Sequence, residues 1–376
     1  MPTTMTFEAA TLADALTKAS RIAPVKGAAF DRAAGYLIET NPAASEVILK
    51  ATDIDSTYLQ HVPAVSGTGD GARWRIPSRI FTDLITGLPM SESSQVQVID
   101  RGDNWIRVSA GRTKAKLAML DPESFPLVPE FPMDHMVTAH DMAVKVEQVA
   151  WSTDPGSQVL QGVHIDGKRL VGTTQHTIAA VPCEVTVDEP ITVPLATLAS
   201  LLKGGSNVQV QAVGRKLHIA LDGETQITAP ILEGAYPKID AVMRDDFTCS
   251  TKVHKATFLD ALGRMLALIK TERAPVLEVE LNGDGLVKMI TFDMEVPEVG
   301  RMQDGLDVAG EFDGIHKLYF NPRLISDAFS NSRADVVVFS WGHADPDRAW
   351  KLPIRVSDDR GYTAYVMPMR GKNDEV

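Results

Sequence analysis

The sequence is poor in cysteine. Only Cys183 and Cys249 occur in 376 residues, far apart and without CxxC spacing. This argues against a disulfide framework or a cysteine-rich zinc site, and it is typical of a reducing compartment. We expect both to be small core residues, because free cysteine is often buried.

Long apolar runs are also absent. No stretch approaches the roughly 18 uninterrupted apolar residues that suggest a membrane span, and the start, Met1–Glu8, lacks a basic segment followed by an apolar core. We therefore expect a cytoplasmic protein without a membrane partner. Hydrophobic residues at 44% and charged residues at 23% are typical of globular chains and disfavour disorder.

Catalytic signatures are missing too. The sequence has no Walker A run, nucleophile elbow or HExxH motif. The glycine run Gly67–Gly71 lacks the strand-to-helix context of a nucleotide fingerprint, and it predicts a flexible hairpin. Asp53 and Asp55 have no accompanying acid or base group in the sequence. We therefore predict a protein that is not an enzyme and needs neither cofactor nor metal.

Basic charge is scarce overall. The chain has 37 Lys and Arg against 49 Asp and Glu, a net charge of −12. Such a balance argues against a nucleic-acid partner, since phosphate contacts need cations, unless the charges are separated in space.

What the sequence does contain is a threefold internal repeat. A short apolar strand, a proline and an amphipathic helix recur around Pro77, Pro194 and Pro322. Proline suits the first helical turn, because its missing N–H would have no partner there. The spacing of about 120 residues is that of whole domains rather than of solenoid repeats.

Each repeat also predicts a second helix and a strand pair. Apolar spacing indicates helices at Phe7–Ala23, Thr138–Ser152 and Val253–Ile269. Alternating polarity indicates strands at 96–99, 105–108, 208–211, 217–220, 336–339 and 352–356. The pattern is typical of an α+β fold with helices on one face of antiparallel sheet.

Two segments rich in proline or in charge, Pro126–Asp134 and Val242–Ser250, are the expected linkers. They divide the chain into three domains, which we expect at residues 1–130, 131–247 and 248–376.

The ending Tyr362–Arg370 resembles the C-terminus of the bacterial DNA polymerase III beta subunit, the beta sliding clamp, where a Tyr-Val-Val-Met-Pro-Met-Arg-like run closes the chain. Each further match is weak alone, but the matches keep their order along nearly the whole chain: Leu49–Asp53, Ile76–Phe81, Gly111–Lys114, Phe125–Pro126, Leu160–Val163, Gly234–Pro237 and Phe320–Asn321.

The resemblance implies the DNA clamp fold, with three repeated domains that each have two inner helices and outer antiparallel sheets. It also implies a head-to-tail homodimeric ring, since contacts whose rotation closes give rings. The implied function is that of a processivity factor. It would encircle double-stranded DNA without reading sequence and tether a DNA polymerase and the clamp loader through short peptide motifs.

The chain departs from the family pattern in three places. Gln175-His176-Thr177 stands where Gly-His-Arg is common, which bears on partner preference. Ala115 stands where the first-domain edge often has a bulky residue, which bears on ring closure. Gly371–Val376 runs past the usual end.

Charge separation reconciles an acidic chain with DNA. Counted over residues 8–22, 78–87, 140–151, 194–204, 254–273 and 322–333, the six expected helices carry a net charge of +3, which leaves −15 for the rest of a chain at −12. An inner wall of helices would then attract phosphates while the outer surface repels DNA. The candidate DNA-binding residues are Lys18, Arg21, Lys26, Arg79, Lys145, Lys203, Lys255, Arg264, Lys270, Arg323 and Arg333.

The resemblance also implies a peptide cleft between the second and third domains. Methionine is unbranched and polarizable, so it suits a site that accepts several partners. The matching positions are Leu160, Thr173, His176, Ile178, Pro237, Val242, Tyr365, Val366, Met367, Pro368, Met369 and Arg370. For ring closure the candidates are Arg112, Lys114, Leu117, Leu268, Ile269, Glu295 and Glu298.

The main alternative is a β-rich repeat protein with a structural or interaction role that never touches DNA. Such a protein has no reason to separate +3 from −15. An enzyme with an unrecognised site would require a cluster of perturbed titratable groups in one pocket.

Overall fold

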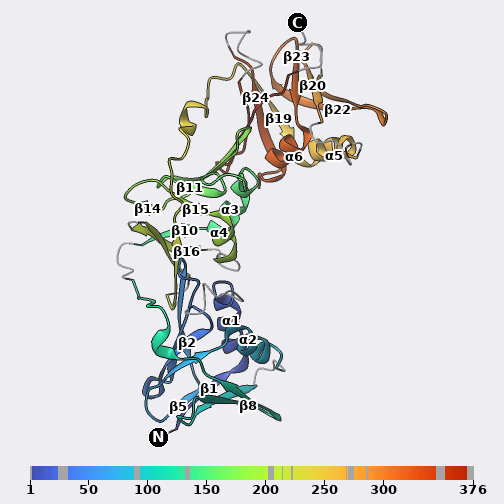
Figure 1. The fold of residues 1–376 in the computed structure, drawn as a ribbon. Helices are drawn as coiled ribbons and strands as arrows, with labels where there is room; N and C mark the ends of the chain where they lie inside the picture. Colours follow the sequence, from blue (N-terminus) through green and yellow to red (C-terminus); the bar gives the residue numbers. More distant parts are fainter. Residues whose placement is uncertain are drawn as a thin grey trace. The chain divides into compact units, whose positions relative to one another are not determined.

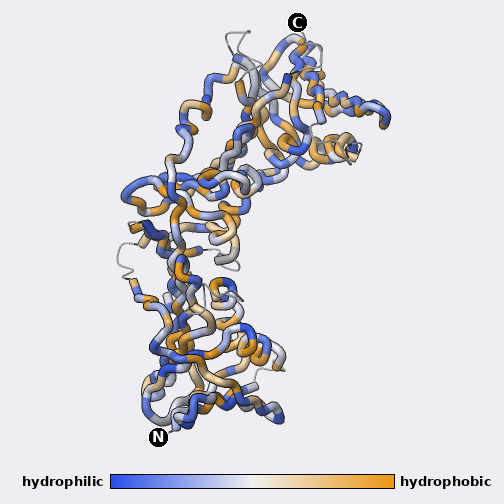
Figure 2. The backbone as a smooth tube through the Cα atoms, in the orientation of Figure 1, coloured by the Kyte–Doolittle hydropathy of each residue, from blue (hydrophilic) through white to orange (hydrophobic). Residues whose placement is uncertain are grey.

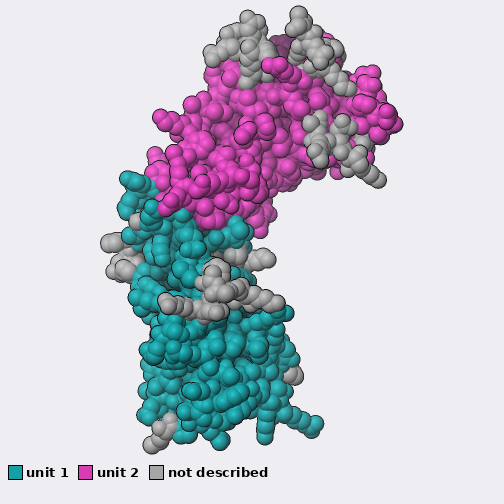
Figure 3. Space-filling view, viewed as in Figure 1, with its two compact units in different colours: residues 1–143, 185–189, 196–231 teal, residues 144–184, 190–195, 232–376 magenta. Residues whose placement is uncertain are grey.

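The computed structural model describes residues 2–23, 33–88, 94–131, 136–201, 207–213, 215–221, 223–267, 269, 275–284, 287–343 and 352–370. The chain forms two compact units (Figure 3). Unit 1 comprises residues 1–143, 185–189 and 196–231, and unit 2 comprises 144–184, 190–195 and 232–376. The expected central domain contributes to both units, and the division into three domains stays a prediction.

Unit 1 contains two sheets (Figure 1). The smaller has the strand order β5 (Ser66–Thr68), β1 (Thr3–Glu8), β7 (Gln95–Asp100), β8 (Trp105–Ala110) and β9 (Thr113–Ala118). The larger has the order β10 (Val137–His140), β16 (Asn207–Val213), β17 (Lys216–Ala220), β18 (Thr225–Pro230), β4 (Thr57–Pro63), β3 (Glu46–Thr52), β2 (Tyr36–Asn41) and β6 (Arg73–Ile76), with β14 (Thr186–Val187) parallel to β16.

Unit 2 is built on one antiparallel sheet of twelve strands. Their order is β15 (Ile191–Pro194), β11 (Gly162–Ile165), β12 (Arg169–Thr173), β13 (Thr177–Pro182), β26 (Thr363–Val366), β25 (Ile354–Ser357), β24 (Val336–Trp341), β19 (Cys249–His254), β22 (Gly300–Glu311), β21 (Lys288–Val296), β20 (Leu277–Asn282) and β23 (Ile315–Phe320). Hydrophobic and hydrophilic residues alternate along many strands in Figure 2, as expected where one face is buried.

Helices pack in pairs on these sheets. In unit 1, α1 (Ala9–Ala19) contacts α2 (Ser78–Thr86) and lies against β3 and β4. In unit 2, α5 (Lys255–Leu266) contacts α6 (Pro322–Ser330) and β22. Two further helices, α3 (Met142–Ala150) and α4 (Leu195–Leu201), follow β10 and β15. The described 3-10 turns are η2 (Pro42–Ala44), η3 (Pro122–Ser124) and η4 (Ile239–Ala241).

An aromatic cluster fills the core beneath α5 and α6. Phe258 of α5 stacks on Phe329 of α6, with ring centroids 3.8 Å apart, and meets Phe292 of β21 edge-on at 5.1 Å. All three side chains are buried. Stacked and edge-on pairs add to the stabilisation from burial alone, so this cluster fixes the helix pair on the sheet.

The α+β expectation and the expected strand pairs are confirmed, as β7, β8, β16, β17, β24 and β25. The expected starts of the helices at 7–23, 138–152 and 253–269 are wrong. Their first residues, Phe7, Thr138 and Val253, lie in the strands β1, β10 and β19. These strands pair with residues far along the chain, which local apolar spacing does not reveal. The glycine run Gly67–Gly71 begins in edge strand β5, which pairs with β1.

Candidate functional site

A cavity of about 390 Å³ opens in unit 2. One wall comes from the β12–β13 turn and from β13 and β26. The other comes from residues 232–248, which we call the connector. Its lining is Thr173, Thr174, Gln175, His176, Thr177, Ile178, Pro237, Lys238, Ile239, Ala241, Val242, Arg244, Leu352, Pro353, Tyr365 and Met367.

Strand pairing between distant segments builds the first wall. β13 and β26 are antiparallel, with Ile178 opposite Tyr365, and the Met367 N–H donates to the His176 carbonyl at 2.9 Å. Ile178, Tyr365 and Ile239 are buried together with Val171 in one apolar cluster. The cavity therefore has an apolar floor that secondary structure holds in place.

Ion pairs anchor the connector wall. Asp240 accepts from Arg169 of β12 at 2.5 Å, and Asp245 pairs with Arg355 of β25. Within the connector, Asp246 accepts from Arg244 at 2.5 Å. Hydrogen bonding from Arg244 lowers the pKa of Asp246.

Phe247 completes the anchoring of the connector. The guanidinium carbons of Arg244 and Arg355 lie 4.7 and 5.0 Å from its ring centroid, within cation–π range. The Tyr365 hydroxyl donates to the Arg244 carbonyl at 3.1 Å. These contacts attach the connector to the same strands that form the cavity floor.

The cavity brings together seven of the twelve residues expected at a peptide cleft: Thr173, His176, Ile178, Pro237, Val242, Tyr365 and Met367. Val366 is buried, and Leu160, Pro368, Met369 and Arg370 do not line the cavity. Sequence reasoning missed Lys238, Arg244, Leu352 and Pro353. The only signal for Arg244 was the charge of the segment Val242–Ser250, which the sequence predicts to be a linker.

The chain uses one kind of edge joint twice. In unit 1, β18 pairs with β4 and places Thr228 opposite Thr57. In unit 2, β26 pairs with β13 and places Tyr365 opposite Ile178. In each case the first strand ends a meander and the second follows a hairpin turn. We call these the first joint and the second joint.

Two further edges have the same form without a partner among the described strands. β9 ends the β7–β8–β9 meander and pairs only with β8. The stretch 300–308 of β22 follows the β21–β22 turn and pairs only with β21.

No family model matches the chain. The beta sliding clamp of Staphylococcus aureus is 23% identical over 352 residues, covering 87% of this chain and 86% of that protein. The solved sliding clamp of Bacillus subtilis has a TM-score of 0.84 at 16% identity, with 99% of this chain and all of that chain covered. The clamp of Pseudomonas aeruginosa bound to griselimycin scores 0.83 at 17% identity. The chain has the fold of the beta sliding clamps and resembles them in sequence over most of its length.

The candidate DNA-binding residues that the structure describes lie on or beside helices. Lys18 of α1 pairs with Asp14 at 2.9 Å, Arg79 of α2 lies 3.7 Å from Asp83, and Lys145 is half-buried in α3. Arg21 follows α1, and with Lys18 it lines a small cavity beside Tyr58. Lys26, Lys203 and Lys270 lie outside the described residues.

In unit 2 the candidate cations on or beside α5 and α6 are bound within the chain. Arg264 of α5 pairs with Asp304 at 2.5 Å, and Arg333 pairs with Glu147 at 3.2 Å. Lys255 donates to the Ser332 carbonyl and Arg323 donates to the Ile269 carbonyl. Exposed pairs of this kind are weak, so they leave the cations able to exchange partners.

The residues expected at a subunit boundary lie in several places. Arg112 is in the β8–β9 turn, Lys114 and Leu117 are on β9, Glu295 is on β21, and Glu298 is in the β21–β22 turn with a φ of 64°. Ile269 is buried at 5% exposure, and Leu268 lies outside the described residues.

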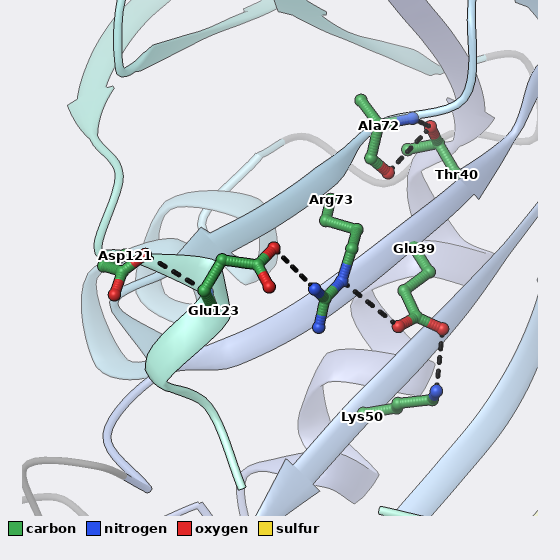
Figure 4. Close-up of polar contacts among 7 residues, drawn as sticks. All are labelled: Glu39, Thr40, Lys50, Ala72, Arg73, Asp121 and Glu123. Atoms are coloured by element: carbon green, nitrogen blue, oxygen red, sulfur yellow. Dashed lines mark hydrogen bonds and ion pairs between the residues drawn. The ribbon is translucent and has the colours of Figure 1, made fainter. Parts of the chain in front are cut away.

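A ladder of ion pairs crosses the larger sheet of unit 1 (Figure 4). Lys50 donates to Glu39 at 2.7 Å, Arg73 lies 3.5 Å from the same carboxylate, and Arg73 binds Glu123 of η3 at 2.7 Å. The ladder joins β3, β2 and β6 to the turn that leads into the segment 125–131.

In the part of the chain that the structure describes, no helix is long and apolar enough to cross a membrane. The same residues contain no group of three His, Cys, Asp or Glu side chains that could hold a metal ion.

Proposed function

We propose that this chain is a DNA sliding clamp, a non-enzymatic processivity factor that acts in the cytoplasm. Two copies would close a ring around duplex DNA and tether a polymerase or a clamp loader through the cavity of unit 2. The observation that carries the proposal is similarity to beta sliding clamps in sequence and in fold along nearly the whole chain.

Ring closure would repeat the joint already used twice. If the residues directly before α2, α4 and α6 (Pro77, Pro194 and Asn321) are aligned, the paired strands make Thr57, Ile178 and Arg301 equivalent. This equivalence assigns the free edge of β22 the same role as β4 and β13.

The matching position on β9 follows from its own meander. In the β7–β8–β9 meander, Val108 of β8 lies opposite Ala115 of β9. In the β16–β17–β18 meander, Ile219 of β17 lies opposite Ile227 of β18. If these two pairs are aligned, Lys116 of β9 corresponds to Thr228 of β18. The third joint, between copies, would then pair Thr113 with Asp304, Lys114 with Gln303, Ala115 with Met302 and Lys116 with Arg301. This choice keeps Arg112, Lys114, Leu117, Glu295 and Glu298 near the boundary and leaves out buried Ile269.

DNA would be held through its phosphates alone. Lys18, Arg79, Arg264 and Arg333, which lie on or beside helices, could exchange their carboxylate partners for phosphate oxygens at little cost. Backbone contacts carry no base information and depend strongly on salt, which is compatible with sliding. We propose the same role for Arg21, Lys145, Lys255 and Arg323.

The cavity would dock partner peptides. Its apolar floor of Ile178, Ile239 and Tyr365 suits an apolar anchor, and Met367 can repack around different side chains. One solved Caulobacter crescentus clamp has polyethylene glycol bound to a proposed beta-motif tethering region, so a protein of this fold holds a ligand at such a region.

The test is topological. Loaded onto nicked circular DNA, the protein should stay bound through gel filtration and should leave once the circle is cut into a linear form. Affinity for a short linear duplex should be weak and should fall with salt. Equal retention on circular and linear DNA would contradict encirclement, and no association with either would favour the structural-protein alternative.

A further inference from the structure

A stack of two rings attaches the connector to the sheet of unit 2. His164 of β11 and Tyr236 of the connector lie nearly parallel, with ring centroids 4.0 Å apart and an interplanar angle of 4°. The Nδ1 atom of His164 lies 3.1 Å from the Thr192 hydroxyl of β15, within hydrogen-bond distance. Neither ring lines the cavity. The stack therefore holds the connector against two strands at a point outside the cavity itself.

Tyr236 carries this contact to the cavity. Its ring packs on the apolar cluster that forms the cavity floor, and its hydroxyl donates to the Val171 carbonyl at 3.4 Å. The next residue, Pro237, lines the cavity. At the start of the connector, the Leu232 N–H donates to the Thr192 carbonyl at 2.7 Å. A displacement of Tyr236 would therefore move one wall of the cavity.

The surroundings of His164 favour its neutral form. Burial lowers the pKa of His164, because a charged ring would lose its water, and the guanidinium of Arg169 acts in the same direction. Asp166, Asp240 and a hydrogen bond with the Ile191 backbone favour the charged ring, but they do not outweigh burial. The closed connector therefore takes up a proton at this ring less readily than an open one, in which water reaches the imidazole.

We propose that His164 is a positioning residue that acts through Tyr236, holding the connector wall closed while its ring is neutral and releasing the wall in acid. The assignment rests on the proposed docking function for its purpose, but the state of the wall can be measured without an occupant. Because the pKa of His164 is lowered in the closed state, its contribution is complete above the ordinary histidine value of about 6.5. The contribution is lost as the pH falls below that value.

The stack sets the size of the effect. An aromatic pair contributes enough to change a local opening equilibrium by about two- to tenfold. Hydrogen exchange of backbone amides reports such local opening. His164→Ala should therefore speed the exchange of the connector amides by about that factor at neutral pH.

The experiment follows hydrogen exchange in the full chain by mass spectrometry of pepsin peptides from the connector. Rates are measured from about pH 5.5 to 8 and corrected for the intrinsic pH dependence of amide exchange. The wild type is compared with His164→Phe, which keeps a ring on Tyr236 but cannot be protonated, and with His164→Ala. His218→Phe is the matched control, since His218 of unit 1 is another histidine whose pKa burial lowers and whose ring lies 4.4 Å from an aromatic ring, that of Phe131.

The connector of the wild type should exchange faster as the pH falls below about 6.5. His164→Phe should keep slow exchange over the whole range, and His218→Phe should respond as the wild type does. Exchange in the wild type that stays constant or slows in acid would overturn the assignment, as would unchanged protection in His164→Ala. An acid response that persists in His164→Phe would assign it to another group, such as His343, which lies 3.4 Å from Asp246.

A second variant covers the case in which His164→Phe does not fold. Tyr236→Ala removes the other ring, so the connector should exchange fast at every pH, and an acid response of wild-type size would again overturn the assignment. None of these outcomes needs an occupant in the cavity. The docking function is tested separately by peptide titration, and either idea can fail while the other stands.

Discussion

Replacing Lys116 with proline tests the proposed joint between copies. The two-residue turn Gly111–Arg112 makes Ala110 and Thr113 a hydrogen-bonded pair, and bonding alternates along antiparallel strands. The backbone N–H groups of Thr113, Ala115 and Leu117 then face β8, and those of Lys114 and Lys116 face the free edge. Lys116→Pro would remove one outward donor without removing a bond to β8.

The magnitude follows from the number of joints. A ring has two copies of the joint, and each loses one donor and leaves one carbonyl without a partner, at about 1–3 kcal/mol per unsatisfied group. Dimerisation should weaken by about 2–6 kcal/mol in total, at least thirtyfold in the dimer–monomer constant. Proline is tolerated on edge strands, so the chain should still fold.

Sedimentation velocity across a dilution series would measure that constant, with the dimer at twice the 40.8 kDa chain mass. Lys116→Ala is the matched control, because it removes the side chain, which lies 4.4 Å from the Trp105 ring, but keeps the N–H. If Lys116→Pro is folded by thermal melting and dimerises as tightly as Lys116→Ala, the proposed third joint is wrong.

Three other predictions concern unit 2. Met367→Ala should weaken peptide binding by about 2 kcal/mol, whereas Met369→Ala, outside the cavity, should not. Equal losses of affinity for the two variants in a peptide titration would show that the binding site lies elsewhere. Phe258→Ala should lower the free energy of unfolding in urea by about 3–5 kcal/mol, and a loss under 1 kcal/mol would contradict its packing role. Because Arg244 lowers the pKa of Asp246, that pair should contribute above the ordinary carboxyl pKa and lose its contribution as the pH falls below about 4. The difference in urea midpoint between wild type and Asp246→Asn should accordingly be constant from pH 8 to 5 and shrink below about pH 4. An increase of this difference at low pH would contradict the expected direction.

Local patterns predicted those parts of the fold that depend on neighbours in sequence. Pro322 begins α6, Pro77 directly precedes α2, and the alternating strands lie where polarity alternates. The helix starts failed because β1, β10 and β19 form only through long-range pairing. Residues such as Phe7, which look helical by spacing, belong to those strands.

The candidate site shows the same division. Resemblance to known clamps supplied Ile178, Tyr365 and Met367, which line the cavity. Leu352 and Lys238 were missed because the cavity is assembled from segments whose proximity no local pattern encodes. The pairing of connector carboxylates with arginines was likewise invisible in a net charge, since Arg169 and Arg355 come from strands far away in sequence.

The first joint has a consequence for how the chain is made. β4 leaves the ribosome about 165 residues before β18, so at about 5–20 residues per second its edge waits roughly 10–30 s for a partner. During that interval β4 can pair with β3, but the strand edge that β18 covers in the finished fold stays open. Unpaired edges promote association between chains, and pairing over such distances is slow. Nascent chains released before residue 225 should therefore aggregate more readily than full-length ones.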